Sequence, residues 1–227
     1  MRNIRYFALI ILSMLFISAY GQSTETRTVK SFEEVSAAEA IDVILIPGDE
    51  EKVVVEAKGV DLEDVITEVS GGELEIHMSR GNYRNVDVTV TVTYKRIYAI
   101  DVSSAASVVT KGMLRSPRLT LEVSSAGDAD LEIEVRDLEA SVSSAGDIIV
   151  SGRAEDSEIR VSSAGDFKGR DLKSNSADVK VSSGGSASVT VQNEINARAS
   201  SGGSIRYFGD PDKEYTSSSS GGSVRKS

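Results

Sequence analysis

The chain of 227 residues is long enough for one large domain or two small ones, and its hydrophobic content of 40% can fill an ordered core. Its formal net charge of −10 disfavours binding to the phosphate backbone of nucleic acids or to anionic membranes. The sequence contains no cysteine, which excludes disulfides, a lipid-modified cysteine, thiol nucleophiles and thiolate metal ligands.

Residues 1–21 have the pattern of a secretory signal peptide. Arg2 and Arg5 give a positive start, residues 6–17 form an apolar run, and Ala19-Tyr20-Gly21 provides a small-x-small cleavage site. The apolar run is shorter than the roughly 20 residues that a membrane-spanning helix needs. We therefore expect cleavage before Gln22, a mature chain without a transmembrane segment, and a location in the periplasm, at the cell surface or outside the cell.

Residues 22–96 predict a β-rich segment that precedes a repeat region within the same domain. The strand candidates are residues 24–29, 41–46, 53–57, 74–78 and 86–92, several of which alternate apolar and polar side chains. Residues 60–66 have apolar side chains at a spacing that fits one or two helical turns.

Residues 97–227 contain seven copies of a short motif, of which Val142-Ser-Ser-Ala-Gly-Asp147 is the clearest. The first serine of each pair stands at position 103, 124, 143, 162, 182, 200 or 219, so the copies are 18 to 21 residues apart. Before each serine pair apolar and polar residues alternate, as at Ala140 and Val142, which predicts stacked columns on the core side. The period predicts an all-β fold, a parallel β-helix or β-solenoid with coils of about 19 residues and a tight corner at each motif.

Three details of the coils follow from the same alternation. Continued through the motif, it places the second serine of each pair, such as Ser144, on the core side, where its hydroxyl can bond backbone groups at the bend. Polar Thr216 and Ser218 replace aliphatic residues in the last coil and predict a polar cap. Outward-facing charges of opposite sign stand side by side, and we interpret them as a solvated surface of interleaved ion pairs: Arg160, Lys180 and Arg198 beside Glu139, Glu158 and Asp178.

The ordered motifs resemble a known family. Ile41-Asp-Val-Ile-Leu-Ile-Pro-Gly-Asp49, Ile97-Tyr-Ala-Ile-Asp-Val-Ser-Ser-Ala-Ala106, the Ser-Ser-Ala-Gly-Asp units and Ile205-Arg-Tyr-Phe-Gly-Asp-Pro211 are similar to the head, or GIN, domain of autotransporter adhesins, a DUF2807-type domain of exported bacterial proteins. The likeness covers residues 29–224 and implies one β-helix-like domain over residues 22–227, with no established catalytic residues. The family's usual Ser-Gly-Ala-Gly appears here as Ser-Ser-Ala-Gly. We find no translocator barrel or long stalk, so we do not expect a self-exporting adhesin.

One set of side chains has the residue type and spacing of a metal-binding or catalytic site. Asp128, Asp147 and Asp166 occupy the same place in three consecutive coils, a pattern that can hold calcium or supply a general acid and base. We interpret them instead as solvated residues that follow a tight glycine corner. His77, the only histidine, alternates with glutamates on the polar side of a strand, so serine triads and zinc sites lack their usual partners.

These observations favour an exported, noncatalytic, adhesin-like β-solenoid without a cofactor, whose long faces contact envelope polysaccharide or surface proteins. Two alternatives stay open: a carbohydrate-active, pectinase-like enzyme that uses the Asp row, and a periplasmic structural or signalling-associated module. Nucleic acid is not an expected partner. The chain has no tryptophan as a platform for sugars, which leaves the tyrosines in that role: Tyr83, Tyr94, Tyr98, Tyr207 and Tyr215.

Overall fold

The computed structural model describes residues 23–227, which form 17 strands and one short 3-10 helix. The predicted signal peptide, residues 1–21, lies outside these described residues. Within residues 23–227, no helix has the length and apolar character needed to span a membrane.

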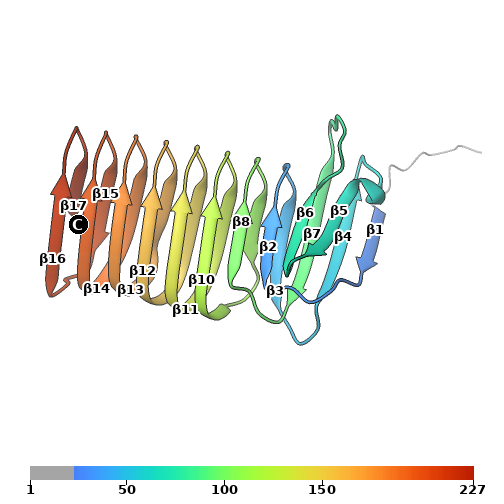
Figure 1. The fold of residues 1–227 in the computed structure, drawn as a ribbon, viewed down its shortest axis with the longest axis horizontal. Coiled ribbons are helices and arrows are strands. Elements are labelled where there is room, and N and C mark those ends of the chain that lie inside the picture. Colours follow the sequence, from blue (N-terminus) through green and yellow to red (C-terminus); the bar gives the residue numbers. More distant parts are fainter. Residues whose placement is uncertain (1–22) are drawn as a thin grey trace, which may run out of the picture.

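The strands form two hydrogen-bonded series that face each other across the core, joined by a row of narrow turns along one edge (Figure 1). We call the sheet whose strands lead into the narrow turns the pre-corner sheet, and the sheet that follows the turns the post-corner sheet. The pre-corner sheet contains, in spatial order, β5 (Val65–Ser70), β6 (Glu73–Met78), β2 (Glu34–Ala37), β8 (Ala99–Val102), β10 (Leu114–Val123), the second halves of β11 (Asp128–Val142), β12 (Asp147–Val161), β13 (Asp166–Val181) and β14 (Ser186–Ala199), and β16 (Lys213–Ser218). The post-corner sheet contains β1 (Ser23–Arg27), β4 (Lys52–Lys58), β7 (Asp87–Tyr94), β3 (Asp42–Pro47), β9 (Ser107–Thr110), the first halves of β11 to β14, β15 (Ser204–Phe208) and β17 (Ser223–Lys226).

The stacked columns confirm the predicted parallel β-solenoid. Val123 pairs with Val142 and Val142 with Val161, in parallel register one coil apart, and all three are buried. On the other side of the corner Ala129, Ile148 and Phe167 stack in the same way. The core therefore lies between the two sheets and is lined by the residues that the alternation predicts.

The connection between successive corners is a bent strand. β11 to β14 each run through the post-corner sheet, bend, and continue in the pre-corner sheet. At one bend Gly152 has a φ of +109°, and a Cβ there would overlap the Ile133 carbonyl oxygen of the preceding coil. Glycine is required at this position for both reasons.

The N-terminal strands lie close to their predicted positions. β1, β3, β4, β6 and β7 correspond to the five candidates within one or two residues at most ends. The predicted helical turn is the 3-10 helix η1 (Leu62–Asp64), but β5 follows at once and the sequence reading missed it. Among the described strands, the antiparallel pairs are β1–β4, β4–β7 and β5–β6, all at this end.

β2 and β3 form an additional coil that the serine motif did not reveal. Glu34–Ala37 pair in parallel with Ala99–Val102, so residues 38–41 occupy the place of the first corner motif. Glu39 and Ala40 have the same positive φ angles as Ser104 and Ala105. This corner was missed because it has no serine pair.

Each corner is a tight turn with two successive residues in the left-handed backbone region. In the clearest copy Ser144 and Ala145 have φ angles of 50° and 59°, and the Gly146 N–H donates to the Ser143 carbonyl at 2.9 Å. This geometry is a type I′ turn. The Ala145 N–H donates to the Ser163 carbonyl of the next coil at 3.1 Å, so the stacked corners form their own backbone ladder.

The prediction that the second serine faces the core is wrong. Ser144 and its equivalents in the other coils are exposed, and the buried corner position is Gly146. Alternation with a period of two holds only for extended backbone, and the two left-handed residues reverse it. The backbone of the neighbouring coils, and not the serine hydroxyl, satisfies the polar groups of the bend.

The two ends of the solenoid differ. At the N-terminal end the Arg27 guanidinium of β1 donates to the Val65 and Leu62 carbonyl oxygens at 2.5 and 2.6 Å, which ties the edges of the two sheets together. At the C-terminal end all six residues of β16 are exposed, and Thr216 and Ser218 stack on Ala197 and Ala199. A polar last coil is therefore present at the predicted place.

Candidate binding face

The outer face of the pre-corner sheet carries two parallel rows of charge. The basic row consists of Arg160, Lys180 and Arg198, which follow one another in adjacent coils. The acidic row consists of Glu139, Glu158 and Asp178, two residues earlier in each strand. Both rows face outward because every second residue of these strands is buried in the core.

The two rows form interleaved ion pairs, as the sequence predicted. Arg160 lies 2.7 Å from Glu139 and 2.5 Å from Glu158, and Lys180 lies 3.4 Å from Glu158 and 3.2 Å from Asp178. The side chains of Arg160 and Lys180 remain 45% and 43% exposed. Pairs at this exposure contribute about 0–1 kcal/mol each to stability. Because both side chains are exposed, their charges also stay accessible to a ligand.

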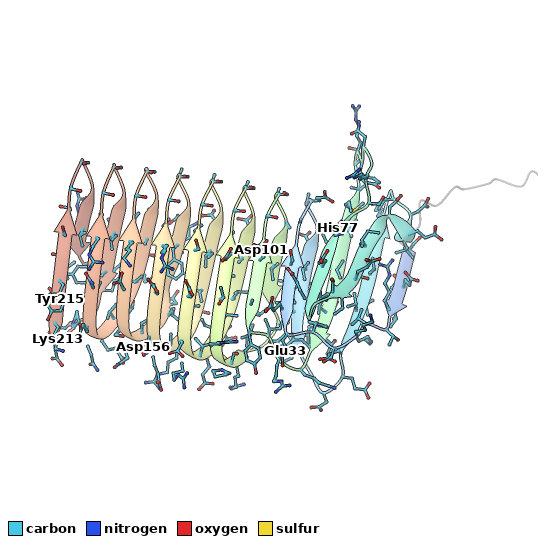
Figure 2. The ribbon with its side chains drawn as sticks, viewed as in Figure 1. Glu33, His77, Asp101, Asp156, Lys213 and Tyr215 are labelled. Carbon is cyan, nitrogen blue, oxygen red and sulfur yellow. The ribbon has the colours of Figure 1, made fainter. Side chains whose placement is uncertain are left out.

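The acidic row ends before the basic row does. The next two residues in the acidic row's register are Asn196 and Tyr215. Among residues 23–227, Arg198 pairs with one carboxylate, that of Asp178 in the preceding coil, at 3.6 Å, and its side chain is 52% exposed. Tyr215 is 55% exposed on the last coil, which leaves an aromatic ring and an incompletely neutralised guanidinium near the C-terminal end of this face (Figure 2).

Two open hollows lie on this face. The acid-lined hollow has a volume of about 630 Å³, and its walls include Tyr98, Glu139, Asp156 and Glu158. The serine-lined hollow has a volume of about 600 Å³ and is formed by the basic row, by serines at the two ends of that row in the same register, and by serines on its corner side. Those serines are Ser141, Ser162, Ser182, Ser200, Ser217 and Ser219.

Toward the N-terminal end the register of the basic row becomes acidic. Glu75, Ser36, Asp101 and Glu122 occupy it in successive strands. Burial raises the pKa of the Asp101 carboxyl, and the nearby Glu122 charge raises it further. The pKa of Glu73 is also raised, first by burial and then by its acidic neighbours. This end of the face thus repels anions.

The predicted Asp row exists on the post-corner sheet. Asp128 pairs with Asp147 and Asp147 with Asp166, so the three carboxylates follow one another in adjacent coils. The Lys168 ammonium lies 3.1 Å from Asp147 and 3.4 Å from Asp166, and Ser186 donates to Asp166 at 2.6 Å. The protein's own cation therefore occupies the space between two of the three carboxylates.

His77 and the Gly71-Gly72 pair take part in the structure of the N-terminal strands. His77 is half-buried in β6, and its Nδ1 donates to the Met78 carbonyl at 2.8 Å. Gly71 and Gly72 form the hairpin turn between β5 and β6. Within residues 23–227, no group of three or more His, Cys, Asp or Glu side chains has a geometry that could hold a metal ion.

Sequence reasoning missed the two hollows and a contact at the edge of one of them. Arg118 lies over the Tyr98 ring at 5.6 Å from its centroid, at the edge of the acid-lined hollow. Tyr215 is one of the tyrosines that the sequence left available to a sugar, and it is exposed on β16, in register after Asp178 and Asn196.

The fold defines the chain as a two-sheet parallel β-solenoid with a long polar outer face, and comparison with known families agrees. Residues 31–211 match the model of the family described as "Putative auto-transporter adhesin, head GIN domain", DUF2807. The match covers most of the chain, and the chain belongs to this family. The resemblance inferred from the sequence motifs is therefore confirmed. No curated protein matches the chain.

Solved structures with the same fold come from species of Bacteroides and Parabacteroides. A putative adhesin from Bacteroides fragilis has a TM-score of 0.84 at 17% identity, over 91% of this chain and 97% of that one. A putative adhesin from Parabacteroides merdae has a TM-score of 0.74 at 17% identity, over 91% and 96%. A putative lipid binding protein from Parabacteroides distasonis has a TM-score of 0.72 at 20% identity, over 91% and 96%. At these identities the likeness shows the fold alone.

Proposed function

We propose that the chain is an exported, noncatalytic, adhesin-like protein that binds envelope or cell-surface components through the outer face of its pre-corner sheet. The observation that carries this proposal is the continuity of that face, on which outward side chains repeat in register from β2 to β16. Such a face suits an extended partner that makes many equivalent weak contacts. Membership of a family described by adhesion supports the same reading.

The arrangement of charged groups supports a noncatalytic role. A general acid needs a carboxyl group with a raised pKa beside the reacting bond. The carboxylates of the acidic row are partly exposed, and each pairs with a cation of the basic row, as Glu158 does with Arg160. The single histidine bonds a backbone carbonyl in another part of the sheet.

The experiment is a retention assay with the mature chain, residues 22–227, immobilised on a surface. Purified envelope polysaccharides and whole bacterial cells are passed over it, with a surface that carries the heat-denatured chain as the control. We expect at least one of these to be retained by the folded chain and not by the denatured one. Equal retention on both surfaces, or none on either, would count against adhesion.

A carbohydrate-cleaving activity is the alternative, and the acid-lined hollow is the observation that favours it. Asp137, Glu139, Asp156 and Glu158 line a space large enough for a sugar residue, and carboxylate pairs are the usual catalysts of glycoside hydrolysis. The same polysaccharides are incubated with the chain, and new reducing ends are measured. Release that Glu139→Gln or Asp156→Asn abolishes, with folding intact, would replace the noncatalytic proposal.

Export is tested independently of binding. The protein recovered from its native host should begin at or near Gln22 and fractionate outside the cytoplasm. Recovery of a chain that still begins at Met1 would contradict the export proposal.

A further inference from the structure

We propose, on the basis of the proposed adhesive function, that the C-terminal coils bind a linear anionic glycan along the basic row of the pre-corner sheet. The ligand would lie parallel to the solenoid axis in the serine-lined hollow. Its carboxylate or sulfate groups would meet Arg160, Lys180 and Arg198 in turn.

The distribution of charge along the chain points to this end of the molecule. Residues 161–227 contain nine Lys and Arg and seven Asp and Glu, whereas residues 23–160 contain 14 and 28. Because the coils stack in sequence order, this difference becomes a separation of charge along the solenoid axis, as Figure 1 shows by the order of its strands. An anionic polymer is repelled by the N-terminal coils and attracted to the C-terminal ones.

Within the C-terminal coils, the basic row has acidic neighbours on one side only. The acidic row lies on the side away from the corners, whereas Ser162, Ser182 and Ser200 lie on the corner side. A ligand approaching from the corner side meets cations and hydroxyls without crossing a carboxylate. At Arg198 the competition is weakest, because Asn196 stands where an acidic residue would continue the row.

The chemistry of the hollow fits a charged sugar polymer better than other polyanions. Serine hydroxyls donate to and accept from sugar hydroxyls, and a guanidinium binds a carboxylate with two parallel hydrogen bonds. The exposed Tyr215 ring lies next to Asn196 in register and offers a flat apolar surface for a sugar ring. The coils repeat every 4.8 Å or so, a spacing close to the advance of an extended sugar chain per residue.

The test measures binding of polygalacturonate fragments, which carry a carboxylate on every sugar, and of neutral dextran fragments of similar length. The purified mature chain is compared with Arg160→Gln/Lys180→Gln/Arg198→Gln by calorimetry at low and moderate salt. We expect the parent to prefer polygalacturonate and the triple variant to lose about tenfold or more in affinity, the effect of one good charge-assisted contact. The matched control, Lys111→Gln/Arg206→Gln/Arg225→Gln, removes the same charge from β15, β17 and the residue that follows β9, and should change affinity by less than about twofold.

A second variant should increase affinity, a result that misfolding cannot produce. Glu158→Gln removes the carboxylate that pairs with both Arg160 and Lys180 and should strengthen polygalacturonate binding severalfold. Equal losses of affinity in the triple variant and its control would show nonspecific attraction and overturn the inference. An affinity that the triple variant leaves unchanged, or that Glu158→Gln leaves unchanged, would also overturn it. Retention of a neutral glycan or of cells by the parent and the triple variant alike would overturn this site and leave the adhesive function standing. Failure of the parent to bind any glycan would overturn the site, and the retention assay with cells would then decide the adhesive function separately.

Discussion

At the corners, each coil holds two successive residues in the left-handed backbone region, and the chain uses alanine at the second of them in the early coils. Ala126, Ala145 and Ala164 have φ angles near 60°, whereas the later corners place Gly184, Gly202 and Gly221 there. A residue with a Cβ pays roughly 1–2 kcal/mol for this conformation. The residue that follows the left-handed pair is buried against the preceding coil and is limited by space instead.

Two neighbouring substitutions should therefore change stability in opposite directions. Ala145→Gly removes the conformational cost of a positive φ, and the greater entropy of glycine in the unfolded chain offsets part of that gain. The net effect should be a stabilisation of about 0.5–1 kcal/mol. Gly146→Ala places a Cβ 3.0 Å from Val123 Cγ1 and 3.1 Å from its carbonyl oxygen, and should destabilise by about 1–3 kcal/mol. Urea unfolding measures both, and a stabilising Gly146→Ala would contradict the packing argument.

Asp101 gives a pH-dependent prediction. Its pKa in the folded protein is raised by burial and then by Glu122, so the folded state is favoured below the unfolded pKa and loses that advantage as pH rises through the folded pKa. Asp101→Asn should raise the melting temperature at pH 7, and the effect should shrink as the pH is lowered and the parent side chain becomes protonated. Ser141→Ala, at a neutral position of the same row, is the control, and a pH-independent effect of Asp101→Asn would refute the electrostatic cause.

The Asp row makes a prediction about calcium. Lys168 already neutralises Asp147 and Asp166, and Asp128 stands at the end of the row. A cation that binds only the folded state would raise its melting temperature. We expect millimolar calcium to leave the melting temperature unchanged in both the parent and the triple Asn variant at 128, 147 and 166. A rise in the parent that disappears in the variant would establish a calcium site.

At the scale of the strands, one side chain links β1 to the edge of the opposite sheet. Arg27 donates to two carbonyl oxygens and to Thr67 at 3.0 Å, and its side chain is only 19% exposed. Arg27→Met should destabilise the protein by roughly 2–3 kcal/mol, because the carbonyl groups of η1 and β5 lose a charged donor. Arg115→Met is the matched control, since Arg115 forms an exposed pair with Glu134 that is worth about 0–1 kcal/mol. Thermal unfolding should separate the two variants clearly, and equal effects would show that Arg27 does not close this end.

The elements that could be predicted from the sequence are those set by alternation and period. Buried columns such as Val123, Val142 and Val161 require only that extended strands repeat at a fixed distance, and both conditions are visible in the sequence. The first coil was missed because Ala38-Glu39-Ala40 forms the same turn from different residues, and turn geometry constrains backbone more than side-chain identity. The ion pairs beside Arg160 were predictable from register, whereas the hollows were not, because a hollow depends on how the side chains of several coils fill the surface together.

At the scale of the whole molecule, stability should be close to a sum over coils and the contacts between neighbouring coils. β10 pairs with β11 and β11 with β12 at a constant offset of 19 residues, with no bulge between these strands. Each of these coils therefore presents to the next one the same columns that it receives from the one before. The solenoid should tolerate the loss of a whole coil and fail when part of a coil is lost.

Deletion of residues 124–142 tests this expectation, because it joins Val123 to Ser143 at equivalent positions and leaves the buried Ser157–Ser174 hydrogen bond of 2.8 Å intact. The shortened chain should remain folded and melt cooperatively at a lower temperature, since one set of coil contacts is lost. Deletion of residues 124–133 removes one corner and the post-corner half of β11. It joins Val123, at the corner end of the pre-corner sheet, to Glu134 near the bend, and no residues remain to span the distance between these two edges. That variant should show no cooperative transition by circular dichroism. Two cooperative melts, or two unfolded proteins, would mean that the coils are not the repeating unit of stability.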